Sequence, residues 1–161
     1  MVMKGKYFGI LIFAAALALA SCKCDDMNTK PEPMAEHIVY IGLDGWGAYS
    51  LPEADMPTVK SLMDQGCWTL QKRTVLPSSS APNWASMFMG AGPELHGYTT
   101  WGSKKPELPS RVILKNDIFP TIFQVARDEY PEAEIGVLYD WAGIKYLVDT
   151  LSLSYHAQSP D

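Results

Sequence analysis

A near-continuous apolar run that ends in an acid and a glycine is the feature that most constrains this fold. The run covers residues 38–43, and Asp44 and Gly45 follow it directly. Such a run is typical of a central strand that is buried on both faces of a parallel sheet. Ligands of such sheets gather beyond the carboxyl ends of the strands, where Asp44 would lie. Asp44 is therefore either a metal ligand or only the cap of an Asp-Gly turn.

Strand and helix patterns continue to alternate along the chain. Further strands are expected at residues 67–75 and 134–139, and helices at residues 56–65, from Pro82, from Asp117 and at residues 142–148. Residues 97–115 have the composition of a loop, and Asp140 follows the last of these strands. The alternation predicts an α/β fold with a layered, mostly parallel sheet and flanking helices.

Single residues set the expected boundaries of two helices. Asp55 can cap the helix at residues 56–65, and Gly66 can end it. Pro131 stops the helix that begins at Asp117, because proline cannot continue a helical hydrogen-bond ladder.

Residues 1–21 have the pattern of an export signal. Lys4 and Lys6 precede an apolar stretch at residues 7–20, which is too short to span a membrane comfortably. The segment Leu-Ala-Ser-Cys at residues 19–22 resembles a bacterial lipobox. The resemblance implies cleavage before Cys22 and a lipid on its sulfur; the alternative is an ordinary secretory signal.

We therefore expect a lipid-anchored protein of the bacterial cell envelope, facing the periplasm or exposed on the outer membrane. Residues 22–36 are rich in Asp, Lys, Pro and Asn, which predicts a disordered tether. Residues 37–161 would then form the folded domain, held to the membrane through the anchor.

Charge and cysteine content narrow the classes of partner. The net charge is −5, with scattered acidic residues, and this argues against nucleic-acid binding. If Cys22 carries lipid, Cys24 and Cys67 are the remaining cysteines. They could form a disulfide in an oxidising envelope, but we favour a free, buried Cys67.

A hydroxyl directly before a predicted helix start is the second informative feature. Ser80 precedes Ala81 and Pro82, so it is either a plain helix cap or a nucleophile at the positive end of the helix. Serine needs a base or a metal to act as a nucleophile, and the three histidines suggest no triad. Metal activation is the better account. Asn83 is either an oxyanion donor or an ordinary polar residue of the first turn.

These segments resemble the start of the alkaline phosphatase superfamily, and in particular its type I phosphodiesterase/nucleotide pyrophosphatase branch. The similar parts are Asp-Gly after the apolar run, Ser-Ala-Pro-Asn at residues 80–83 and Pro-Glu-Leu-His-Gly at residues 93–97. The resemblance covers roughly residues 37–141. It implies that Asp44 is a metal ligand, Ser80 both nucleophile and metal ligand, and Asn83 an oxyanion contact. It also implies two divalent metal ions, usually zinc.

Two residues, Ser80 and Trp84, depart from the family pattern. Ser80 stands where that branch usually has threonine, which keeps the hydroxyl, and Trp84 stands where histidine or asparagine is frequent. The sulfatase branch needs an arginine where Trp84 stands, so sulfate-ester hydrolysis is the less favoured chemistry. Ser78 and Ser79 leave the identity of the nucleophile open by one or two residues.

The family's later metal ligands are the largest difference. The family has further Asp and His ligands, including an Asp-His-Gly segment, and this chain has no Asp-His-Gly. We interpret His96 as structural, and His37 and His156 as ordinary surface or loop residues. The chain is therefore expected to be the N-terminal part of such an enzyme, ending before the site is complete.

The resulting prediction is metal-dependent hydrolysis of a small phosphate ester, either diester or monoester, through a serine nucleophile. The alternatives are a non-catalytic envelope lipoprotein with a degenerate hydrolase fold and a sulfatase-like enzyme.

The Cys22→Ala substitution tests the lipoprotein hypothesis. Without the sulfur that carries the lipid, we expect the protein to leave the membrane fraction or to remain unprocessed. Fractionation and mass spectrometry of the N-terminus measure both effects. Processing at the same bond with retained membrane attachment would contradict the hypothesis.

Overall fold

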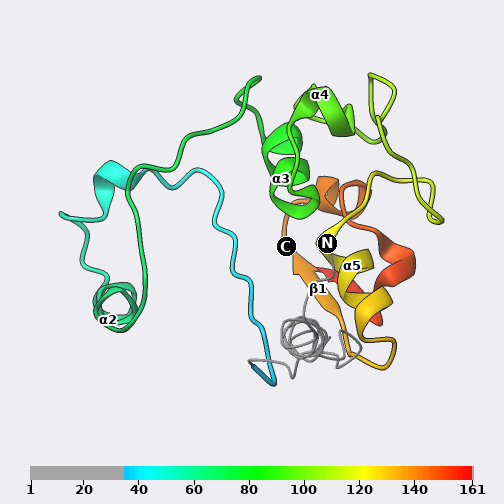
Figure 1. The fold of residues 1–161 in the computed structure, drawn as a ribbon. Helices are drawn as coiled ribbons and strands as arrows, with labels where there is room; N and C mark the ends of the chain where they lie inside the picture. Colours follow the sequence, from blue (N-terminus) through cyan, green and yellow to red (C-terminus); the bar gives the residue numbers. More distant parts are fainter. Residues whose placement is uncertain (1–34, 161) are drawn as a thin grey trace, which may run out of the picture. The chain divides into compact units, whose positions relative to one another are not determined.

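The computed structural model describes residues 35–160 (Figure 1). The chain divides into two units at Gly42, and within the first of them the described residues 35–42 form no helix or strand. The second unit contains the helices α2 (Pro57–Gln65), α3 (Ser80–Met89), α4 (Pro93–His96) and α5 (Ile122–Glu129), the short 3-10 helices η1 (Ala48–Ser50), η2 (Ala142–Tyr146) and η3 (Thr150–Ser152), and the strands β1 (Gly136–Tyr139) and β2 (Tyr155–Gln158). Among the described residues, no helix has the length and apolar character needed to cross a bilayer.

The sheet of the described region is a parallel pair, β1 and β2. Gly136 pairs with Tyr155 and Tyr139 with Gln158, and η2 and η3 lie in the connection between the strands. The strand expected at residues 134–139 is thus present, whereas β2 was not predicted. Helices and a parallel strand pair are compatible with an incomplete α/β fold, but the expected layered sheet with several parallel strands is not seen.

Residues 38–43 do not form the predicted central strand. They belong to no strand among the described residues, and Ile38 and Ile41 are 89% and 76% exposed. An apolar run favours a buried strand, but a strand forms only where neighbouring chain completes its hydrogen-bond ladder. The described sheet has two strands, and neither pairs with this run.

Residues 67–75 also differ from their prediction. They form no strand, and nearly all of them are exposed. Their mixed polarity offers no continuous apolar face that packing could bury. Cys67 is free, as expected, but it is exposed rather than buried.

Two helix starts lie elsewhere than predicted. Met56, not Asp55, is the N-cap of α2, and no side chain caps that helix. α5 begins at Ile122 rather than Asp117, whose positive φ of 57° interrupts a helix. Pro120 disfavours helical geometry at the residue before it, and the Thr121 hydroxyl then caps α5 by accepting a bond from the Gln124 N–H.

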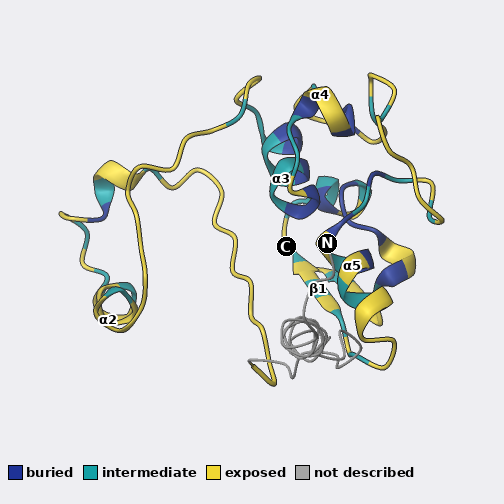
Figure 2. Ribbon diagram, in the orientation of Figure 1, coloured by how far each residue is buried: buried dark blue, intermediate teal, exposed yellow. Residues whose placement is uncertain are grey.

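The core of this region forms around α3. Ala81 and Ala85 are fully buried on that helix, and Phe88 packs against Phe123 of α5 with ring centroids 5.5 Å apart. Leu147, after η2, is also fully buried and belongs to the same cluster (Figure 2). The two alanines keep the helix surface flat, so neighbouring elements can approach it closely.

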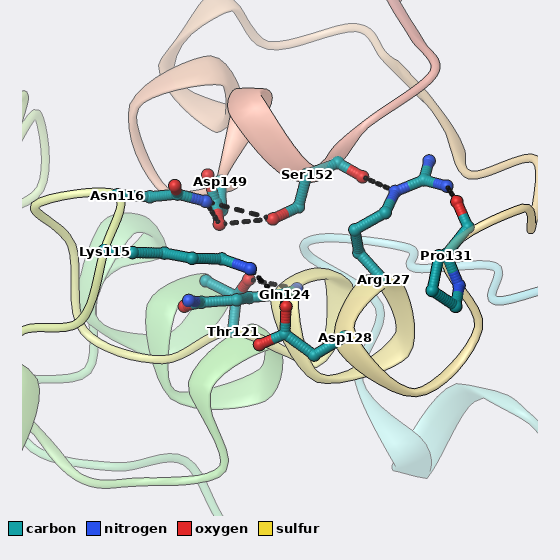
Figure 3. Close-up of polar contacts among 9 residues, drawn as sticks. All are labelled: Lys115, Asn116, Thr121, Gln124, Arg127, Asp128, Pro131, Asp149 and Ser152. Carbon is teal, nitrogen blue, oxygen red and sulfur yellow. Dashed lines mark hydrogen bonds and ion pairs between the residues drawn. The ribbon is translucent and has the colours of Figure 1, made fainter.

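A polar cluster joins α5 to the connection between the strands (Figure 3). Asp149 is buried and accepts hydrogen bonds from the side chains of Asn116 and Ser152. The Arg127 guanidinium donates to three backbone carbonyls and one hydroxyl, those of Ser152, Pro131, Ala133 and Ser154. Arg127 thus links the end of α5, the turn that follows it and the residues before β2.

The Arg127→Lys substitution tests this linkage. Lysine keeps the charge but cannot reach four acceptors with one planar fork. We expect it to lower the free energy of unfolding by about 1–3 kcal/mol. Urea denaturation measures the change. Arg111→Lys is the matched control, because the Arg111 side chain makes no hydrogen bond within residues 35–160, and equal destabilisation by both changes would contradict the prediction.

Candidate active site

The two residues singled out in the sequence meet at the start of α3. Ser80 is the first residue of the helix, and its Oγ donates a hydrogen bond of 2.9 Å to Oδ2 of Asp44. The residue in the cap position is Ser79, which has extended backbone and makes no side-chain cap bond. Ser80 is therefore not the plain N-cap, and its hydroxyl is turned toward a carboxylate. Ser80 lies at the N-terminal end of α3, where the helix dipole favours anions.

Asp44 is held by three donors. Besides Ser80, the indole Nε1 of Trp84 donates to Oδ2 at 3.2 Å, and the Gly45 N–H donates to Oδ1 at 2.8 Å. Gly45 has a φ of 70°, which glycine adopts without strain, so the chain turns tightly back onto the carboxylate. The sequence analysis identified Asp44 and Ser80 as site residues but not Trp84. The available signal was spacing: Trp84 is four residues after Ser80, so the two side chains lie on one face of the helix.

Hydrogen bonds lower the pKa of the Asp44 carboxyl. Burial raises the pKa of its carboxyl, but the hydrogen bonds from Ser80, Trp84 and Gly45 outweigh burial and bring the pKa below its ordinary value. At neutral pH Asp44 is a carboxylate, which can accept hydrogen bonds or bind a cation.

Asn83 is engaged with the segment that leads into α3. Its Oδ1 accepts bonds from the Thr74 hydroxyl at 2.7 Å and the Val75 N–H at 3.0 Å, and its Nδ2 donates to the Ser79 carbonyl at 3.0 Å. One amide N–H is thus committed to the backbone next to Ser80. These bonds tie residues 74–75 to the start of α3. They correspond to the second interpretation of Asn83, an ordinary polar residue of the first helical turn.

His96 lies in the packing beside α3. It is fully buried, its Nδ1 accepts the Tyr98 N–H, and its Nε2 lies 3.0 Å from the Ser86 Oγ. Because Nδ1 accepts a hydrogen bond, we assign the ring proton to Nε2, which then donates to the Ser86 Oγ. The Ser86 hydroxyl in turn donates to the Pro82 carbonyl. Burial lowers the pKa of His96, with Glu94 opposing this weakly, so the ring is neutral. This is the structural role expected from the sequence.

The remaining acids and histidines singled out in the sequence lie outside this arrangement. Asp140 is exposed at the end of β1, and within residues 35–160 no hydrogen bond joins it to Asp44 or Ser80. His37 and His156 are exposed, and His156 faces Tyr139. Cys22 lies outside the described residues.

The donor set fits part of a metal site. Asp44 and Ser80 offer two oxygens, which suit a divalent cation. In the described part of the chain, no three His, Cys, Asp or Glu side chains gather in one place. Zinc normally keeps at least three protein ligands, so these two residues fit as a fraction of its ligand shell.

Comparison with known families finds a match that covers the site. Residues 38–119 match the family described as type I phosphodiesterase / nucleotide pyrophosphatase. The matched segment contains Asp44, Ser80, Asn83 and His96 and ends before α5. No curated protein and no solved structure matches the chain significantly.

The Ser80→Ala substitution tests the electrostatics of the pair. Removing the Ser80 donor leaves the burial of Asp44 less opposed, so we expect the pKa of Asp44 to rise. In the wild type, the lowered pKa of Asp44 stabilises the folded state at pH values above the ordinary aspartate pKa. This stabilisation is lost as the pH falls through the pKa that Asp44 has in the folded protein. The carboxyl ¹³C shift of Asp44 against pH measures the midpoint. Ser79→Ala is the control, and an unmoved midpoint in Ser80→Ala would refute the contact.

Proposed function

Because this chain belongs to the type I phosphodiesterase / nucleotide pyrophosphatase family, we propose that it hydrolyses phosphate esters with Ser80 as the nucleophile. The observation that supports this best is the 2.9 Å contact between the Ser80 hydroxyl and the Asp44 carboxylate at the start of α3. Both residues lie in the segment that matches the family.

The start of α3 supplies the features that phosphoryl transfer needs. The first-turn N–H groups of the helix, at its positive end, stabilise the oxygens of a phosphoryl group. Ser80 loses its hydroxyl proton to solvent, and its Oγ attacks phosphorus in line with the leaving oxygen. The bond to the leaving group breaks, the leaving oxygen takes a proton from solvent, and a phosphoserine forms. A water molecule then hydrolyses the phosphoserine and releases phosphate or a phosphate monoester.

The proposal also includes metal ions. We propose two divalent cations, with zinc expected, and Asp44 and Ser80 as two of the ligands. A bound cation supplies charge stabilisation and lowers the pKa of the serine hydroxyl. Asp44 meanwhile orients the hydroxyl, and its own carboxylate form is secured by its three hydrogen bonds.

Asn83 contributes to the same site in two ways. Its bonds to Thr74, Val75 and Ser79 fix the backbone next to the nucleophile. We propose that its amide also lies close enough to the phosphoryl oxygens to donate to one of them when substrate is bound.

The setting proposed for this activity is the bacterial cell envelope. The lipobox-like segment before Cys22 supports a lipid anchor and a mature protein that meets small phosphate esters outside the cytoplasm. The scattered acidic charge of the chain gives no support to nucleic acid as a binding partner.

Replacement of Ser80 by alanine, in a zinc-loaded version of the protein that includes the family's later metal ligands, tests the nucleophile. We expect hydrolysis of bis-p-nitrophenyl phosphate or p-nitrophenyl phosphate to fall by several orders of magnitude, because a covalent nucleophile is lost. Ser80→Thr keeps the hydroxyl and should retain measurable turnover. Asn83→Ala should cost on the order of 10²-fold, as for one oxyanion donor.

Ser79→Ala is the matched control for the position of the nucleophile. Trapped phosphoserine, located by mass spectrometry after acid quenching, should map to Ser80. Full activity in Ser80→Ala with loss in Ser79→Ala would move the nucleophile by one residue. Absence of turnover in the wild-type version that includes the later metal ligands would instead favour a non-catalytic lipoprotein.

A further inference from the structure

Two side chains of α3 converge on one oxygen atom of Asp44. Ser80 and Trp84 are four residues apart, so they lie one above the other on the same face of the helix. The Ser80 hydroxyl is 2.9 Å and the Trp84 indole nitrogen 3.2 Å from Oδ2 of Asp44. The carboxylate oxygen that faces the proposed nucleophile is therefore shared with an indole N–H.

Packing fixes the indole in place. The ring of Trp84 is half-buried and stacks on the ring of Phe88 with centroids 5.6 Å apart and planes at 28°. Phe88 is buried and contacts Phe123 of α5. Asp44, in contrast, is an exposed residue whose side chain would be free to rotate without its donors.

We propose that Trp84 is a positioning residue for the phosphoryl transfer proposed above: its indole N–H holds the Asp44 carboxylate beside Ser80 throughout the reaction. The inference rests on the proposed function. When the Ser80 oxygen turns to phosphorus, the hydrogen bond from Ser80 to Oδ2 is lost. Oδ2 then keeps the indole as its donor, so the carboxylate stays where the serine needs it.

Indole chemistry suits this task. The indole N–H is a donor only, and it carries no charge that could repel a cation beside Asp44. A histidine would present a ring nitrogen at the same ring position, since Nε2 of imidazole and Nε1 of indole are equivalent along their five-membered rings. Histidine can therefore restore the donor without restoring the stacking on Phe88.

Two substitutions separate the hydrogen bond from the packing. Trp84→Phe keeps an aromatic ring on Phe88 and removes the N–H; Trp84→His keeps a ring N–H and loses most of the stacking. Trp68→Phe is the matched control, because Trp68 is an exposed tryptophan on the segment outside the site. All are made in the version that includes the family's later metal ligands and are assayed with zinc and bis-p-nitrophenyl phosphate.

We expect Trp84→Phe to lower kcat roughly 10- to 100-fold with little change in KM, as for loss of one hydrogen bond to a charged group. Trp84→His should recover most of this loss, and Trp68→Phe should match the wild type. Wild-type kcat in Trp84→Phe, or equal loss in Trp84→Phe and Trp84→His, would overturn the positioning role.

A second readout does not depend on turnover. The indole N–H signal of Trp84 in a ¹H–¹⁵N spectrum, assigned by its absence from Trp84→Phe, should move in Asp44→Ala while that of Trp68 stays in place. If the wild-type protein hydrolyses no phosphate ester but the signal moves, the proposed function fails and the contact stands. If the signal does not move, the positioning inference is overturned whatever the activity.

Discussion

The burial of one face of α3 is the interaction on which the rest of the described region depends. Ala81 and Ala85 bring the helix against its neighbours, and Phe88 carries the contact on to α5. Helix α4, η2 and α5 all pack against this one helix. Because the next face of the same helix carries Ser80 and Trp84, the packing that stabilises the region also fixes the geometry of the candidate site. One face of the ten-residue helix α3 thus packs in the core, and another face carries the residues that bind Asp44.

Sequence patterns located the elements that are encoded locally. Gly66, which was expected to end the helix at residues 56–65, is the C-cap of α2. The strand expected at residues 134–139 is present as β1, shortened by two residues. In each case the signal lies within the segment itself, so no distant partner is needed to interpret it.

The failures share a different cause. Residues 38–43 and 67–75 were predicted as strands from composition, and a strand needs partners that composition cannot supply. β2 escaped prediction because its four residues, Tyr-His-Ala-Gln, are too few and too polar for a strand signal, and they form a strand only where β1 supplies a partner. Asp44 and Ser80 were singled out by a strand-end and a helix-start pattern and by the family resemblance. The spacing of Trp84 from Ser80 places it on the same helix face, but its contact with Asp44 depends on the fold of residues 40 positions away.

The four bonds of Arg127 have a consequence for how this region opens. The guanidinium holds carbonyls that precede both β1 and β2, while its own backbone belongs to α5. Movement of the chain before either strand would break bonds of the half-buried guanidinium, so we expect fraying of the sheet and melting of the helix to be coupled. Amide exchange in the three elements would then share a single opening free energy, which makes them one cooperative unit of folding rather than three independent ones.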